Sequence, residues 1–434
     1  MPSLFFNSQE LFRLSDTAPT DPLVAHSMTT RERHAALSLS SIYALRMLGL
    51  FMVLPVFMIE AKHYEGGHDA SAVGLAMGLY GLVQALLQIP FGLAADRWGR
   101  KRVMYLGLAL LALGSLGGAL ATSVTQLAWA RALQGGGAIS AAVTALLADQ
   151  TRDEVRTKGM ALIGGSIGLM FALSLLLGPV LSGWGGLGAI FGTTFCLSVC
   201  GMAMVRWWTP PEAPLSERPA SSHRLGALLF HPDLIRLNVG VFVLYAVQLA
   251  SWVAIPALLV QAGVASEHHG YVYLPAVLLS FVVMGVSLFP LERRGLLKPL
   301  FLACIALVLM VQLAWAWMAW QGSPSMAWLA LWLFLFFCGF NVLEASQPSL
   351  ASRLAPTGAR GAALGVYNTL QSLGIFAGGA VGGWLAKQQG AHSVFLASAL
   401  LMLIWLATAW GGRYVNSTPS APDAAHQTPL KQAA

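Results

Sequence analysis

Unbroken apolar runs of about 20 residues fill most of this 434-residue sequence. A helix needs about 20 apolar residues to cross the hydrocarbon core of a bilayer. Twelve such runs follow one another, with a longer polar break after the sixth. They cover residues 36–61, 71–95, 102–121, 126–148, 159–182, 187–208, 236–262, 270–290, 298–320, 326–350, 361–385 and 392–411. The pattern predicts an all-α integral membrane protein with twelve transmembrane helices.

Composition excludes the main alternatives to a helical membrane protein. Charged residues make up 10% of the chain and hydrophobic residues 56%, whereas soluble domains carry about 25% charged residues. A soluble enzyme has too little interior to bury so much apolar surface, and a disordered chain contains few apolar residues. An outer-membrane barrel would show alternating segments of about ten residues instead.

Polar segments divide the chain into two groups of six helices. We predict a disordered cytoplasmic tail at 1–34, a six-helix bundle at 35–208, a cytoplasmic linker at 209–233, a second six-helix bundle at 234–412 and a disordered cytoplasmic tail at 413–434. The two halves also share short sequence patterns, which is typical of transporters built from internal repeats.

Lysine and arginine residues collect on one side of the expected membrane. The tails and the loops after every even-numbered segment hold 21 of the 25, whereas the other loops hold only Lys62 and Lys387. Basic loops stay in the cytoplasm, so we expect both termini there. The net charge of +7 is therefore a signal of topology, not of nucleic-acid binding.

The loop between the second and third segments combines glycines, one acid and several cations. It reads Gly92-Leu-Ala-Ala-Asp96-Arg97-Trp-Gly99-Arg100-Lys101. The carboxylate can accept charge-assisted hydrogen bonds, and the glycines permit a tight turn or a close approach of two backbones. A basic turn that only orients the helices would explain the cations, but not an acid with glycines on both sides.

This loop resembles the signature loop of the major facilitator superfamily, with Ala94 in place of the usual leucine. In the fifth segment, Gly178, Pro179 and Gly183 resemble the antiporter motif of that family. Residues 46–55, 78–92 and 340–345 are similar to the YajR-type drug/proton antiporters. We do not expect the short tail here to form the soluble C-terminal domain of that type. The resemblance implies the major facilitator fold and the inner membrane of a bacterial cell.

The resemblance also implies that the loop is a conformational gate. Asp96 is expected to meet the N-terminal end of helix 11, near Gly361, when the cavity faces outward. A helix N-terminus favours a nearby carboxylate because its N–H groups lack partners. Arg100 and Arg156 are expected to frame the acid.

Three charged residues lie well inside apolar segments, namely Arg46, Arg131 and Glu344. A charge at the centre of a bilayer costs about 2.5–3.5 kcal/mol on insertion scales, so it marks a functional site by default. Glu344 is the only acid among them and is the candidate proton carrier. Gln134 lies three residues from Arg131, as Asn341 does from Glu344, so each pair faces one side of its helix. These five residues form the predicted proton or substrate path, and a static ion pair between Arg46 and Glu344 is the alternative.

These features predict a secondary active transporter that works by alternating access. The chain contains no phosphate-binding G-x-x-x-x-G-K-[ST] loop, so the proton gradient rather than ATP is the expected energy source. The expected activity is efflux of a small amphipathic compound in exchange for protons. An importer or an uncoupled facilitator on the same fold stays open, and an integral-membrane enzyme is a remote alternative.

The expected partners are a small-molecule substrate, protons and the lipid bilayer. We expect no catalytic residue, no cofactor, no metal and no nucleic acid, and we expect a monomer. Histidines and acids in two outer loops, 63–69 and 267–269, are better explained as solvated loop residues than as a metal site or a pH sensor.

Overall fold

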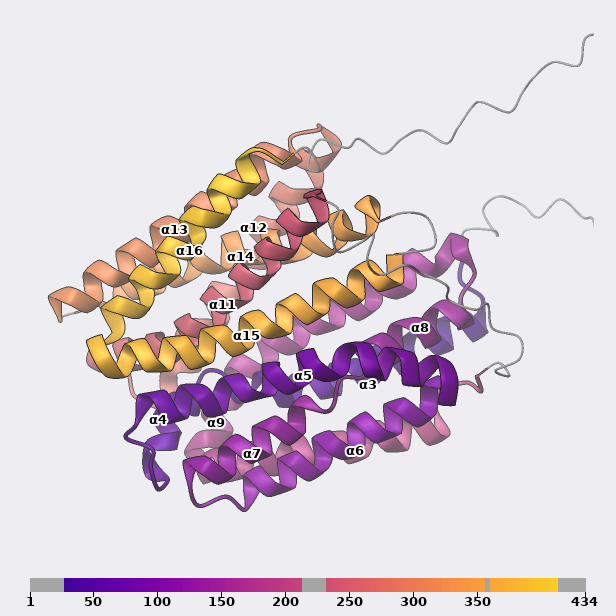
Figure 1. The fold of residues 1–434 in the computed structure, drawn as a ribbon, viewed down its shortest axis with the longest axis horizontal. Coiled ribbons are helices and arrows are strands. Elements are labelled where there is room, and N and C mark those ends of the chain that lie inside the picture. The colour runs from indigo at the N-terminus through magenta and orange to yellow at the C-terminus, as the bar shows by residue number, and fades with distance from the viewer. Residues whose placement is uncertain (1–26, 213–231, 323, 356–359, 413–434) are drawn as a thin grey trace, which may run out of the picture.

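The computed structural model describes residues 27–212, 232–322, 324–355 and 360–412. Long helices fill this part of the chain, and its one isolated β-bridge joins Glu65 and Ser123. Much of the two predicted tails and of the linker lies outside the described residues. The prediction of an all-α fold is confirmed for the described part (Figure 1).

Each predicted apolar segment coincides with one helix, with part of one, or with two consecutive helices. The first half contains α3 Thr30–Phe51, α4 Phe57–Glu60, α5 Ala70–Trp98, α6 Arg100–Ala119, α7 Val124–Gly135, α8 Ser140–Gln150 and α9 Asp153–Trp207. The second half contains α11 Pro232–Gln261, α12 His269–Arg293, α13 Leu297–Gln321, α14 Met326–Leu354, α15 Arg360–Gln389 and α16 Ala391–Trp410. By length and composition alone, nine helical stretches in the described residues could cross a membrane.

Two helix breaks fall inside predicted segments, and a third lies in the predicted gap between the fifth and sixth segments. The first segment is interrupted at residues 52–56, which include Pro55, and the fourth at 136–139, where consecutive glycines end α7. The fifth and sixth segments form one long helix, α9, with a kink at Gly185 and Gly186. Gly186 has a φ of +58°, a conformation that favours glycine because it lacks a Cβ atom.

The first helix also begins earlier than the predicted start of the bundle at residue 35. Thr29 and Glu32 form a reciprocal capping box, in which each side chain bonds a backbone N–H group of the other residue. This arrangement satisfies N–H groups that have no partner within the helix. It places the start of α3 at Thr30.

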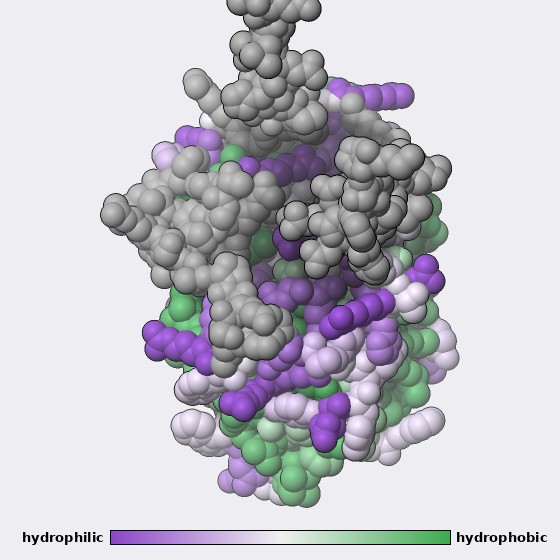
Figure 2. All heavy atoms as spheres, turned by 90° about the vertical axis from the view of Figure 1, so that its right-hand side faces the viewer, coloured by the Kyte–Doolittle hydropathy of each residue, from purple (hydrophilic) through white to green (hydrophobic). Residues whose placement is uncertain are grey.

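The described chain begins and finishes at the same end of the bundle, toward the right in Figure 1. We call this the terminal end, and the opposite one the far end. Figure 2 looks at the terminal end and shows hydrophilic side chains gathered across it, with hydrophobic side chains on the flanks. Such a distribution suits a helical bundle whose flanks face lipid.

The buried apolar residues show how the two halves meet. First-half residues near the far end, such as Val73 and Phe171, belong to one large core that also contains Trp252 and Phe337 of the second half. First-half residues near the terminal end, such as those around Leu146, form a separate core with no second-half member among the described residues. The halves therefore share a core only toward the far end.

Candidate functional site

Two buried arginines meet around one tyrosine in the first half. Arg46 of α3 donates a hydrogen bond from Nη2 to the Tyr80 hydroxyl at 3.0 Å, and Nε donates to the carbonyl oxygen of Gly137 at 2.9 Å. The guanidinium of Arg131 lies over the Tyr80 ring, 4.8 Å from its centroid. Both arginines are about 98% or more buried, so neutral groups solvate two cations inside the bundle.

Local sequence creates this arrangement. The glycines after α7 stop the helix, and the Gly137 carbonyl oxygen there accepts hydrogen bonds from Arg46 and from the backbone N–H group of Ile139. Gln134 accepts a hydrogen bond from Arg131 at 2.8 Å and donates one to Ser115 of α6 at 2.8 Å. The predicted pairing of Arg131 with Gln134 on one side of the helix agrees with this geometry.

The second half contributes the acid. The Tyr245 hydroxyl of α11 donates a hydrogen bond of 2.6 Å to Oε1 of Glu344 on α14. The side chain of Glu344 is only partly buried. This carboxyl group is partly exposed, and its hydrogen-bond partner is a neutral hydroxyl. It can therefore gain or release a proton without breaking an ion pair.

Asn341 and Glu344 contact different helices although they are three residues apart. The Asn341 amide donates a hydrogen bond of 2.8 Å to the hydroxyl of Ser280 on α12, whereas Glu344 bonds α11. A spacing of three residues means only that both side chains leave α14 on the same face. Asn341 therefore fastens α12 to α14, and Glu344 is the member that faces a titratable partner.

The structure keeps the arginines and the acid in separate halves. The ion pairs of the described residues do not include one between Arg46 and Glu344, and Arg46 is held by Tyr80 and Gly137 instead. This geometry does not favour a static Arg46–Glu344 pair.

The signature loop forms a charged network at the terminal end. Arg100 lies between two carboxylates, with Nη1 3.1 Å from Asp96 and Nε 2.6 Å from Asp149. Gly99 has a φ of +103°, and a Cβ atom there would lie 2.8 Å from the Glu212 carboxylate. That carboxylate accepts a hydrogen bond of 2.8 Å from the backbone N–H group of Arg100. The glycine therefore lets the start of the linker approach the start of α6.

Other residues of the loop have different surroundings. The ammonium group of Lys101 donates a hydrogen bond of 2.7 Å to the carbonyl oxygen of Thr209. Arg97 is exposed, and a Cβ atom on Gly92 would lie 3.8 Å from the Cβ atom of Ala141. The side chains at the start of α15, around Gly361, lie outside the described residues, so the expected contact between Asp96 and helix 11 stays a prediction.

The antiporter-like motif packs inside the first half. A Cβ atom on Gly178 would lie 2.5 Å from the carbonyl oxygen of Met52, next to Pro55. A Cβ atom on Gly183 would lie 3.7 Å from the Cβ atom of Glu267 in the second half, an ordinary contact distance. Helix α9 continues through Pro179 and kinks later, at Gly185 and Gly186.

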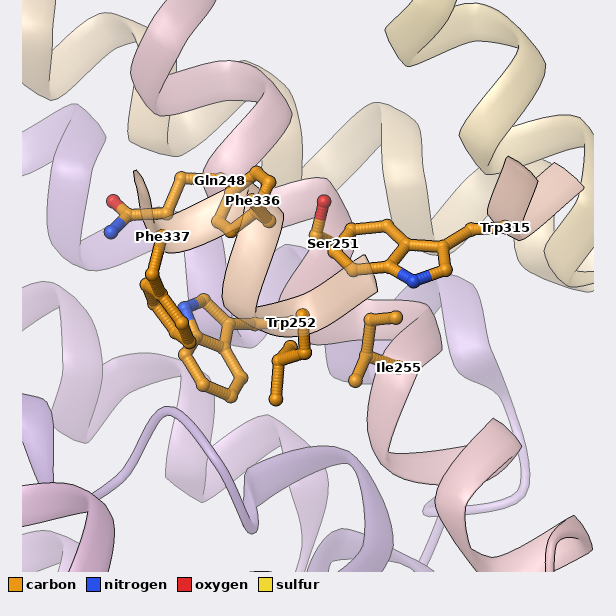
Figure 3. Close-up of a pocket in the computed structure, with 8 residues that line it drawn as sticks. Gln248, Ser251, Trp252, Ile255, Trp315, Phe336 and Phe337 are labelled. Carbon is orange, nitrogen blue, oxygen red and sulfur yellow. The ribbon is translucent and has the colours of Figure 1, made fainter. Parts of the chain in front are cut away.

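A narrow aromatic pocket lies in the second half. Its walls come from α11, α13 and α14. The lining residues are Gln248, Ser251, Trp252, Ile255, Trp315, Leu333, Phe336 and Phe337. Figure 3 shows Trp252 and Phe337 on one side and Trp315 on the other. Phe337 also packs edge-on against Phe171 of the first half, with ring centroids 5.9 Å apart, so the pocket adjoins the contact between the halves.

Metal binding has no geometric support in the part of the chain that the structure describes. Those residues contain no group of three or more histidine, cysteine, aspartate or glutamate side chains that could hold a metal ion. His63 lies 3.7 Å from Glu60, and the imidazole of His269 lies 3.2 Å from the carbonyl oxygen of Val264.

Comparison with known proteins identifies the family. A family model described as "Major Facilitator Superfamily" matches residues 39–379. The chain belongs to this superfamily. The match includes residues of both predicted halves.

Two bacterial relatives are similar over most of the chain. The inner membrane transport protein YajR of Escherichia coli K12 is 39% identical over 387 residues, which span 88% of this chain and 84% of that protein. The multidrug resistance protein MdtH of Aeromonas salmonicida is 26% identical over 366 residues, or 79% of this chain and 86% of that protein. The predicted resemblance to the superfamily and to YajR is confirmed.

Solved structures share the fold. The nucleoside transporter NupG aligns with a TM-score of 0.69 at 16% identity, over 87% of this chain and 99% of that one. The chain is therefore a membrane transporter rather than an enzyme, and a multi-pass protein of the inner membrane.

Several residues of the site were missed by the sequence analysis. Tyr80 and Tyr245 bond the charged residues but look like ordinary apolar-segment tyrosines in the sequence. Asp149 and Glu212 bind the signature loop from distant segments. A buried charge implies a nearby hydroxyl or carbonyl partner, but it does not say which one.

Proposed function

We propose that the protein exports a small amphipathic compound in exchange for protons, by alternating access. Glu344 is the proton carrier in this proposal. The observation that carries it is the partly buried Glu344 carboxyl group, which bonds the neutral Tyr245 hydroxyl. The similarity to a multidrug resistance protein supports efflux.

The proposal includes an orientation for the twelve segments. We place the terminal end in the cytoplasm, because 21 of 25 lysines and arginines fall in the tails and loops on that side. Cysteines introduced at Leu296 and at Gln389 test this orientation in intact cells. An impermeant thiol reagent should label the Gln389 variant only, and labelling in the opposite sense would overturn the orientation.

The aromatic pocket is the proposed place for the apolar part of the substrate. Trp252 and Phe337 offer ring faces and edges. The Ser251 hydroxyl is engaged elsewhere, because it donates to the Val247 carbonyl oxygen and accepts a hydrogen bond from Gln312. The proposal therefore places only an aromatic or other apolar group of the substrate here, with any polar region of the compound outside this pocket.

Glu344→Gln tests the proton carrier. The amide is nearly isosteric and cannot ionise, so it resembles the protonated carboxyl group. In proteoliposomes with an imposed pH gradient, we expect substrate efflux to fall at least about tenfold, because the uncharged amide cannot release a proton. Counterflow of substrate should continue, because exchange requires no net proton release.

A matched acid provides the control. Glu292→Gln changes a carboxylate that pairs with Arg353 at 2.7 Å at the terminal end, and it should leave gradient-driven efflux near the wild-type rate. Wild-type efflux from Glu344→Gln would eliminate Glu344 as the carrier. Loss of counterflow together with a lower melting temperature would assign it a structural role instead.

A further inference from the structure

Helices α5 and α15, one from each half, pack backbone against backbone toward the far end. A Cβ atom on Gly379 would lie 2.7 Å from the carbonyl oxygen of Gly74 and 2.8 Å from the Cα atom of Gly78. One on Gly383 would lie 2.5 Å from the carbonyl oxygen of Ala70. Real Cβ atoms essentially never come so close to backbone. We call Gly74, Gly78, Gly379 and Gly383 the glycine seam.

An ion pair closes the seam at the far end. Asp69 precedes α5, and Lys387 lies in the last turn of α15. The Lys387 ammonium nitrogen lies 2.7 Å from Oδ2 of Asp69. Oδ1 of the same carboxylate accepts a hydrogen bond of 2.9 Å from the N–H group of Ser71 and so caps α5. One oxygen therefore caps a helix and the other joins the two halves.

The Asp69 side chain is a charged carboxylate at neutral pH. The hydrogen bond from Lys387 and those from the N–H groups at the start of α5 hold the pKa of Asp69 below its usual range. Both side chains are partly exposed to solvent, at 46% for Lys387 and 39% for Asp69. Exposure keeps the pair weak enough to open, since water can solvate both charges when they separate.

The same two helices are less tightly joined toward the terminal end. A Cβ atom on Gly365 of α15 would meet no heavy atom within 4 Å, and one on Gly92 of α5 would lie 3.8 Å from Ala141 of its own half. At this end of α5, Asp96 pairs with Arg100 of its own half. Among the described ion pairs that involve α5 or its cap, the one between Asp69 and Lys387 is the one that bridges the halves.

We propose that the Asp69–Lys387 pair is an external latch that stabilises the cytoplasm-open state. The latch rests on the orientation and the alternating access of the proposed function. Opening the external side would separate α5 from α15 at the glycine seam and pull the two charges apart. The latch would then set how often the external side opens, without taking part in proton exchange at Glu344.

Distances between spin labels measure the two states without any substrate. One labelled pair, at Thr125 of α7 and Gln389 of α15, reports the external side. A second pair, at Arg33 of α3 and Leu296 before α13, reports the cytoplasmic side. All four positions are exposed, and the labels are attached in a background whose four native cysteines are replaced.

Asp69→Asn isolates the latch from the helix cap. Asparagine caps helices about as well as aspartate, so the variant loses the charge that pairs with Lys387 and keeps the start of α5. We expect the ratio of externally open to cytoplasm-open molecules to rise about two- to fivefold, the size of effect measured for exposed ion pairs. Lys387→Gln should give the same shift, and the double variant Asp69→Asn with Lys387→Gln should shift no further than either single variant.

A second ion pair supplies the control. Asp233 pairs with Arg236 at 3.0 Å within α11 and bridges nothing, so Asp233→Asn should leave both distance distributions unchanged. Unchanged distributions in both Asp69→Asn and Lys387→Gln would overturn the latch. A shift in the double variant equal to the sum of the two single shifts would overturn the pairing as its cause. Because the labels report the state directly, failure of proton coupling at Glu344 would leave this test intact.

Discussion

Helices α5 and α15 lie along each other, but their two ends are built differently. Toward the far end, glycine backbones touch and a carboxylate reaches across to a lysine of the other half. Toward the terminal end, the carboxylate of Asp96 pairs with Arg100 of its own half. Helix α5 therefore has an acid near each end, Asp69 and Asp96. Of these two, only Asp69 joins the halves in this state.

The glycine seam offers the strongest way to break this comparison. Gly379→Ala would press a methyl group against the backbone of α5, which cannot yield as a side chain can. Overpacking costs about 1–3 kcal/mol, and this cost falls only on the state in which the seam is closed. We therefore expect the externally open fraction to rise by about tenfold or more in the spin-label distances.

Gly117→Ala is the matched control for the seam. A Cβ atom at Gly117 would meet no heavy atom within 4 Å, so the distances should stay at their wild-type values. Wild-type distances in Gly379→Ala as well would show that the seam does not set the state.

Removal of the charge at the terminal end should act in the opposite direction. If Asp96 stabilises the externally open state by meeting helix 11, Asp96→Asn should favour the cytoplasm-open state and reduce transport by about tenfold. Asparagine adds no bulk, so expression and melting temperature should be unchanged. Transport at the wild-type rate from correctly inserted Asp96→Asn would remove Asp96 from the gate.

The external pH gives the smallest expected effect. Because the pKa of Asp69 is lowered from its ordinary value of 3.8, the contribution of the pair is fully present above that value. It is lost only as the pH falls through the lowered pKa. Changing the external pH from about 7.5 to about 5 should therefore leave the latch charged, and the shift caused by Asp69→Asn should be equal at both pH values. Disappearance of that shift at the lower pH would contradict the assigned charge state.

Much of the fold could be predicted because apolar runs of about 20 residues report their own helices. Local breaks were harder to predict. The glycines after α7 are visible in the sequence, but helix propensity alone does not say whether neighbouring helices will tolerate a break there. The kink of α9 lies at Gly185 and Gly186, inside the gap predicted between residues 182 and 187, but the sequence does not show that Gly186 adopts a positive φ there.

The candidate site was only partly predictable from the sequence. Charges in apolar segments identify Arg46, Arg131 and Glu344 because burying a charge is costly. Their partners could not be predicted, since Tyr80 and Tyr245 come from other helices. The pairing of Asp69 with Lys387 spans 318 residues, and no spacing rule connects residues so far apart.

The two arginines around Tyr80 have a consequence for the proposed energy coupling. They place positive charge inside the first half, where hydroxyl, carbonyl and ring groups hold them. A hydrated proton entering that half would meet two cations in low-dielectric surroundings, and the repulsion is strong there. The first half would then act as an electrical insulator and confine proton passage to the helices around Glu344. If proton release from Glu344 requires substrate, such a transporter does not consume the proton gradient when substrate is absent.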